Sequence, residues 1–205
     1  MTGQINLNSQ AGQTIYNICC LENVQTIVEI GTWNGHGSTK CIYQAIQNSQ
    51  KKLYSFEIDS EKYQEAYNFY KDKPEINIYN GYISNKFIDL DSLDDKFFSD
   101  YPIEIKKKWY YEDYKNITST KCLLDKVPEK IDFLILDGGE FNSFYEYESL
   151  KDRSTYIFCD DTNPPCIKNY LVRLDLIKNH EIIIDNPNER HGFCLAKIQN
   201  HKLNK

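Results

Sequence analysis

Short runs of β-branched and aromatic residues alternate along the chain with longer amphipathic stretches. These short runs predict strands at residues 26–31, 53–59, 76–79, 131–137 and 156–160. Helical periodicity predicts helices after most of these runs, at residues 38–48, 61–71, 141–150 and 166–178. This alternation is typical of an α/β protein in which helices cover both faces of a parallel sheet.

The C-terminal part of the chain departs from this alternation. Residues 181–185 and 192–198 both have the pattern of strands, and only residues 186–191 separate them. A crossover helix needs a dozen or more residues, so these two strands must pair antiparallel. The prediction is therefore a Rossmann-like α/β fold whose seven-stranded, mostly parallel sheet ends in a C-terminal antiparallel hairpin. Ordinary dinucleotide-binding folds lack this hairpin.

Two segments lie outside the pattern, an N-terminal extension (1–24) and a long insertion (85–130). A helix is predicted around residues 11–21 of the extension. The insertion contains Trp109, Tyr110, Tyr111 and Tyr114, and long connections are often functional. These aromatic side chains could stack on a sugar as part of an acceptor lid, or they could pack in the core, which is the commoner role.

Composition limits the class of protein. A chain of 205 residues without a repeat or linker is expected to form one domain (1–205). The net charge of −6 argues against a general nucleic-acid binder. Neither a signal peptide nor an apolar run long enough to span a membrane is evident, so a soluble cytoplasmic protein is expected. The seven cysteines form no C-x-x-C pair, which favours buried, reduced thiols.

A glycine-rich loop joins the first predicted strand to the next helix. Gly31, Gly35 and Gly37 have the spacing G-x-x-x-G-x-G, which differs from the G-x-G-x-x-G of dinucleotide binders. The loop could be a plain strand-to-helix turn, or its glycines could let the backbone approach a ligand at the helix N-terminus. Glu57 ends the second predicted strand, where its carboxylate could accept hydrogen bonds from both ribose hydroxyls. Asp59 or Ser60 is then expected to cap the following helix.

These features resemble a known family. The pattern Glu29-x-Gly31-x-x-x-Gly35-x-Gly37, with Glu57 and then Asp137 after the fourth strand, resembles the signature of class I S-adenosylmethionine-dependent methyltransferases. The terminal hairpin matches their fold, so the resemblance covers residues 26–198. It implies that the glycine loop holds the methionine part of the cofactor, Glu57 the ribose, and residues 80–84 the adenine. The residues expected at the cofactor are Glu29, Gly31, Thr32, Trp33, Asn34, Gly35, Gly37, Ser38, Glu57, Ile58, Gly81, Tyr82 and Asp137.

A narrower resemblance concerns two acidic motifs. Residues 136–141 (LDGGEF) and 159–163 (CDDTN) resemble methyltransferases of glycan and polysaccharide clusters, including sugar O-methyltransferases. Asp137 with the pair Asp160 and Asp161 also resembles metal-dependent O-methyltransferases that act on catechols and macrolide sugars. This implies that the three carboxylates hold Mg²⁺ or Mn²⁺, which would activate an acceptor hydroxyl. Alternatively, Asp161 caps a helix and Asp160 binds backbone amides.

The proton acceptor is less well defined than the cofactor site. The macrolide-sugar enzymes often have a further Asp and a His where this chain has residues 138–140 (GGE), so their base does not transfer. His191 begins the last strand, which places it at the same sheet edge as Asp137, although it could equally be an exposed turn residue. Glu140 is the other candidate base or acceptor ligand. Asp137, His191 and Glu140 are therefore the predicted catalytic residues.

The functional hypothesis is an S-adenosylmethionine-dependent O-methyltransferase assisted by a divalent metal. Its expected acceptor is a sugar hydroxyl of a glycan or nucleotide sugar, with no role for nucleic acid or a membrane. Two alternatives stay open: methyl transfer to another small-molecule hydroxyl or amine, and a non-catalytic module that binds a nucleoside or glycan. A nicotinamide oxidoreductase is a weaker third alternative, because the glycine spacing opposes it.

Overall fold

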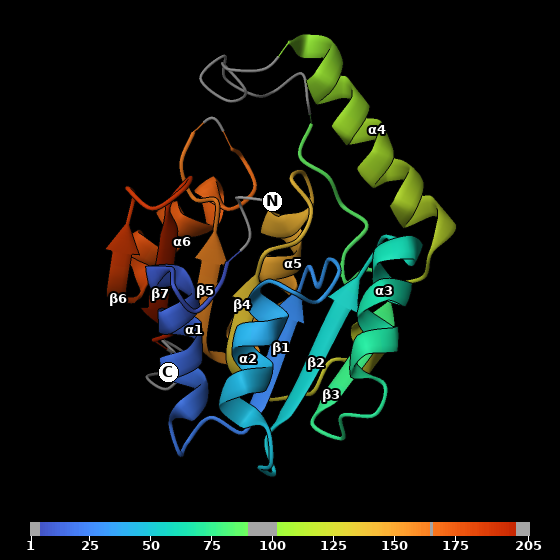
Figure 1. Ribbon diagram of the computed structural model, residues 1–205. Coiled ribbons are helices and arrows are strands. Elements are labelled where there is room, and N and C mark those ends of the chain that lie inside the picture. Colours follow the sequence, from blue (N-terminus) through green and yellow to red (C-terminus); the bar gives the residue numbers. More distant parts are fainter. Residues whose placement is uncertain (1–4, 90–101, 165, 200–205) are drawn as a thin grey trace.

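The computed structural model describes residues 5–89, 102–164 and 166–199. At its centre is a seven-stranded sheet with the strand order β3-β2-β1-β4-β5-β7-β6 (Figure 1). The first five strands are parallel, and β7 pairs antiparallel with both β5 and β6. The predicted fold class is therefore confirmed. The strands are β1 (Thr26–Ile30), β2 (Lys52–Glu57), β3 (Ile76–Asn80), β4 (Ile131–Leu136), β5 (Ser154–Asp160), β6 (Glu181–Asn186) and β7 (Phe193–Lys197).

Helices cover both faces of the sheet (Figure 1). Their bounds are α1 (Gln10–Cys20), α2 (Ser38–Ile46), α3 (Ser60–Tyr70), α4 (Ile103–Ser119), α5 (Ser143–Leu150) and α6 (Tyr170–Asn179), with short 3-10 turns at Leu124–Lys126 and Lys151–Arg153. Apolar residues of α1 and α2 pack against one face, and those of α5 and α6 against the other. The helix predicted in the N-terminal extension is α1. Helix α4 belongs to the long insertion, whose residues 90–101 lie outside the described part.

Strand β4 lies at the centre of the sheet, which explains why its sequence is apolar except for Asp132. All six of its residues are buried. Phe133 and Ile135 join the core on one face, whereas Leu134 and Leu136 join the core on the other. A strand covered on both faces has no polar side to alternate with.

The sequence prediction was wrong about the start of the last helix. It placed the start at residue 166, but α6 begins at Tyr170. The side-chain amide of Asn169 donates to the carbonyl oxygens of Leu136 at 2.9 Å and Asp160 at 2.7 Å. These bonds tie the preceding segment to the ends of β4 and β5, so it cannot continue the helix.

Two expectations about composition can be compared with the fold. Within the described ranges, none of the helices is both long and apolar enough to cross a membrane. All seven cysteines are free thiols, as expected. Four of them are buried, but Cys20 and Cys122 are exposed, so burial was wrongly predicted for these two.

Candidate functional site

A cavity of about 800 Å³ opens at the edge of the sheet where the parallel strands end. The loops that follow β1, β2, β3 and β4 form most of its wall, and α4 closes one side. Ile5, Lys168 and Arg190 complete the wall from distant parts of the chain. Ligands of open α/β sheets bind at this edge, so the cavity is the candidate functional site.

The glycine loop is shaped by close approaches that a side chain would prevent. Gly31 has φ +93°, and a Cβ atom there would lie 2.1 Å from the carbonyl oxygen of Asp137. Gly35 has φ +79°, and its Cβ would lie 2.7 Å from the ring of Tyr70. The Tyr70 hydroxyl also donates to the Gly35 carbonyl at 2.7 Å. Both positions therefore require glycine because the loop passes close to other parts of the protein, which the sequence analysis did not anticipate.

Glu57 connects the glycine loop to the end of β2. Its Oε2 accepts a hydrogen bond from the Trp33 amide at 2.6 Å, and its Oε1 accepts one from the Asp59 amide at 2.8 Å. The side chain is only 5% exposed yet forms part of the cavity wall. Each carboxylate oxygen has a further lone pair, so a ligand hydroxyl could still bind. Asp59 caps α3 by accepting from the amides of Glu61 and Lys62, as predicted.

Most of the predicted cofactor residues line the cavity. They are Gly31, Thr32, Trp33, Gly37, Ser38, Glu57, Ile58, Gly81 and Asp137. The structure does not place Glu29, Asn34, Gly35 or Tyr82 in the cavity wall formed by the described residues. Glu29 is fully buried beneath the loop, where it accepts hydrogen bonds from Thr39 Oγ1 at 2.8 Å and Ser55 Oγ at 2.5 Å. This position suits a residue that holds the glycine loop in place rather than one that contacts a ligand.

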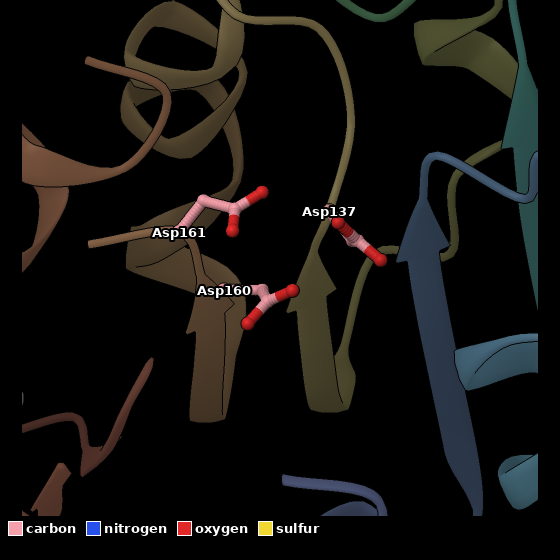
Figure 2. A group of neighbouring side chains, drawn as sticks. All are labelled: Asp137, Asp160 and Asp161. Atoms are coloured by element: carbon pink, nitrogen blue, oxygen red, sulfur yellow. The ribbon is translucent and has the colours of Figure 1, made fainter. Parts of the chain in front are cut away.

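The three predicted metal ligands lie together at the ends of β4 and β5 (Figure 2). Asp137, Asp160 and Asp161 each offer a carboxylate oxygen, and these oxygens lie within 4.8 Å of one another. Two basic side chains lie among them. Lys168 Nζ is 2.9 Å from Asp137 Oδ1 and 2.7 Å from Asp161 Oδ2, and Arg190 Nη1 is 3.1 Å from Asp160 Oδ2. The repulsion between the carboxylates is therefore offset by residues of the chain.

Charges within this cluster shift one another's pKa values. Burial acts against the charged form of Lys168, but Asp137 and Asp161 outweigh it and hold the lysine pKa well above its usual range. Burial also acts to raise the pKa of Asp161, yet Lys168 and Arg190 lower it overall. Burial, followed by the charges of Asp137 and Asp161, raises the pKa of Asp160 to about 8. Lys168 is thus an ammonium ion at neutral pH.

The two other candidate bases lie outside the cavity wall that the described residues form. His191 is exposed, and it is the preceding residue, Arg190, that lines the cavity. Glu140 Oε1 accepts hydrogen bonds from the amides of Ile167 at 2.7 Å and Lys168 at 3.3 Å. The position of Glu140 therefore suits orientation of the Lys168 segment better than proton transfer.

Several residues of the cavity were not singled out from the sequence. Lys168, Arg190, Glu146, Asp113 and Asn116 all line it. Burial raises the pKa of Asp113 to about 7 and that of Glu146 to about 8. Glu146 is 2% exposed, and its Oε2 has no hydrogen-bond partner among the described residues. No motif marks these positions, because each reaches the cavity only through the packing of α4, α5, the segment before α6 or the connection between β6 and β7.

The aromatic cluster of the insertion divides into two parts. Trp109 and Tyr110 pack in a small core with Phe141, as the alternative interpretation expected. Tyr111 and Tyr114 are 66% and 53% exposed. The residues by which α4 lines the cavity are polar instead, namely Glu112, Asp113, Lys115 and Asn116.

Buried carboxyl groups at the site predict a pH-dependent stability. Burial raises the pKa of Glu29 and Glu57 from the ordinary 4.5 to about 7, and that of Glu146 to about 8. Between these values the unfolded chain has lost protons that the folded chain retains, so the free energy of unfolding falls as pH rises. We expect the melting temperature of the ligand-free protein to decrease from about pH 5 to about pH 8. Calorimetry of wild type and Glu146→Gln checks this, because the melting temperature of the variant should decrease less over the same pH range. An equal or steeper decrease in the variant would contradict a raised pKa for Glu146.

The sequence matches no protein-family model and no curated protein. Solved structures are similar over nearly the whole chain. An O-methyltransferase from Bacillus cereus in complex with SAH is 14% identical with a TM-score of 0.61, covering 97% of this chain and 84% of that one. A putative caffeoyl-CoA O-methyltransferase from Staphylococcus aureus is 12% identical with a TM-score of 0.59, covering 93% and 84%.

A third similar structure is an rRNA methylase from Streptococcus thermophilus, 13% identical with a TM-score of 0.54, covering 93% of this chain and 98% of that one. At such low identities the similarity establishes the fold alone. The chain therefore has the class I methyltransferase fold that the sequence resemblance implied. Since the similar proteins are named for different acceptors, the fold does not select one.

Proposed function

We propose that this chain transfers a methyl group from S-adenosylmethionine to a hydroxyl group of a small molecule, and that this molecule is a sugar. The observation that carries the proposal is the joint position of the glycine loop and Glu57 in one cavity at the carboxyl edge of a methyltransferase sheet. A carboxylate at the end of β2 suits the two hydroxyls of a ribose. The glycine loop, at the N-terminus of α2, leaves room for the rest of the cofactor.

The class of cofactor can be tested by binding. Calorimetric titration should show binding of S-adenosylhomocysteine and none of NAD, because the glycine spacing does not provide the close approach that a pyrophosphate needs. Binding of NAD alone would replace the proposal with an oxidoreductase. Turnover can then be tested by incubating the protein with S-adenosylmethionine and a panel of sugars, nucleotide sugars, phenols and amines. The mass of a methylated product separates an enzyme from a binding module.

The sugar acceptor rests on the resemblance of the two acidic motifs to those of glycan-associated methyltransferases. The wall contributed by α4 supports it, since Glu112, Asp113 and Asn116 offer polar groups that could bind sugar hydroxyls. Methylation of phenols in preference to sugars would leave the methyltransferase proposal standing and remove its sugar part. A divalent metal, which the sequence also predicted, is not part of this proposal, because Lys168 and Arg190 already pair with the predicted ligands.

Substitutions in α4 separate its two kinds of aromatic residue. Trp109→Ala should lower the free energy of unfolding by roughly 2 kcal/mol, because the half-buried indole packs in the small core beneath the helix. Tyr111→Ala should change stability by less than about 0.5 kcal/mol, because the ring is 66% exposed. If the insertion is an acceptor lid, Tyr111→Ala will instead raise the KM for the acceptor and leave S-adenosylhomocysteine affinity unchanged. Denaturant unfolding and steady-state kinetics check both; an unchanged KM would remove Tyr111 from the acceptor site.

A further inference from the structure

The acidic cluster at the ends of β4 and β5 has a cation built into it. Lys168 Nζ lies between Asp137 Oδ1 and Asp161 Oδ2, at 2.9 and 2.7 Å. Both distances are those of charge-assisted hydrogen bonds. The lysine side chain is only 11% exposed and lines the cavity. A divalent ion bound to the same two oxygens would have to displace the ammonium group or lie against a like charge.

The backbone around Lys168 is fixed on both sides, which distinguishes it from a surface lysine that happens to reach an acidic group. Glu140 Oε1 accepts hydrogen bonds from the amides of Ile167 and Lys168. Asn169 donates to the carbonyl oxygens at the ends of β4 and β5, and its own side-chain oxygen accepts from Ser143 Oγ at 2.7 Å. These contacts aim the lysine at the cluster before any ligand arrives.

The charges at the cluster also argue against a bound divalent metal ion. Three carboxyl groups face two permanent cations, Lys168 and Arg190. Displacing the Lys168 ammonium would separate a largely buried charge from its two carboxylate partners, which is strongly unfavourable. A divalent cation would have to supply that free energy in addition to its own dehydration, and Mg²⁺ gives up water reluctantly. The residues present therefore do not fit the metal that the sequence predicted.

We propose that the Lys168 ammonium takes the place of a divalent metal at this site, so that Asp137, Asp160 and Asp161 bind no metal ion and methyl transfer is metal-independent. An ammonium group has three N–H donors, of which two go to Asp137 and Asp161. The third is left for a ligand oxygen at the cavity wall, so Lys168 positions the acceptor by a hydrogen bond. The part of this inference that concerns the acceptor rests on the proposed function; the part that concerns metal binding does not.

Titration with Mn²⁺ tests the metal part of the inference without turnover. Binding is measured as the loss of the electron paramagnetic resonance signal of free Mn²⁺. Wild type should bind no Mn²⁺ at the cluster below about 1 mM, which is the range of weak oxygen-ligand sites. Lys168→Ala frees the carboxylates and should bind Mn²⁺ at least about tenfold more tightly. Lys168→Arg keeps the positive charge and should stay as weak as wild type. Adding Asp160→Asn to Lys168→Ala should remove the gained binding.

Three results would overturn the inference. The first is tight Mn²⁺ binding by wild type that Asp160→Asn abolishes, and the second is turnover that disappears in EDTA and returns with Mg²⁺. The third is a folded Lys168→Ala protein that binds no more Mn²⁺ than wild type, because the carboxylates would then form no cation site. Should Lys168→Ala not fold, wild type and Asp160→Asn still decide the matter. Failure of S-adenosylhomocysteine to bind would instead reject the proposed function and leave the Mn²⁺ result standing.

Discussion

Gly31→Ala is expected to destabilise the protein by roughly 3 kcal/mol or more and to abolish cofactor binding. A positive φ costs an L-residue roughly 1–2 kcal/mol. The new Cβ would also lie 2.1 Å from the carbonyl oxygen of Asp137, and moving that backbone costs about 1–3 kcal/mol more. In a domain of this size, roughly 3 kcal/mol lowers the melting temperature by about 6–12 °C. The same movement separates the loops after β1 and β4, which together form one wall of the cavity.

Gly138→Ala is the matched control, because this residue lies on the other side of the same close approach. Its Cβ would lie 3.0 Å from Ile30 Cγ2 and 3.4 Å from Glu146 Oε2, its nearest backbone contact would be an ordinary one at 3.7 Å from the Ile30 carbonyl carbon, and its φ is not positive. Calorimetric melting and S-adenosylhomocysteine titration of both variants measure the difference. A melting temperature for Gly31→Ala equal to that of Gly138→Ala would show that the two loops do not pass as closely as described.

Glu57→Ala is expected to weaken S-adenosylhomocysteine binding at least tenfold. The substitution removes both proposed hydrogen bonds to the ribose, each worth about 1.5–3 kcal/mol when charge-assisted, and about 1.4 kcal/mol already corresponds to a tenfold change. It also removes the acceptor of the Trp33 and Asp59 amides, so the glycine loop loses its attachment to β2. The two effects act in the same direction on affinity.

Glu57→Gln separates these effects. Glutamine keeps the shape and one acceptor oxygen, so the loop should hold better than in Glu57→Ala while the charge-assisted part of ribose binding is lost. Glu65→Ala serves as a control, because Glu65 is an exposed acid on α3 that pairs with Lys62 and does not line the cavity within the described part of the chain. Isothermal titration of each folded variant gives the dissociation constants. An unchanged value for Glu57→Ala would remove Glu57 from the cofactor site.

The sequence by itself determined the fold class and the edge of the sheet at which the site lies. Periodicity was sufficient because burial on one or two faces dictates the spacing of apolar residues, as in β4. The short connection between β6 and β7 allowed only antiparallel pairing. Gly31 and Glu57 could be assigned to the site because each lies at the end of a strand, where the chain itself fixes the position of a residue.

Tertiary structure alone decided how the site is completed. Lys168 lies 31 positions after Asp137, and no pattern in the sequence indicates that residues 166–169 fold back to bring them together. Asp113 and Glu146 reach the cavity through helix packing, which depends on side-chain fit rather than periodicity. The same limit applies to the metal prediction: acidic residues at strand ends indicate a need for positive charge, and that Lys168 and Arg190 lie among them depends on contacts that form only in the folded chain.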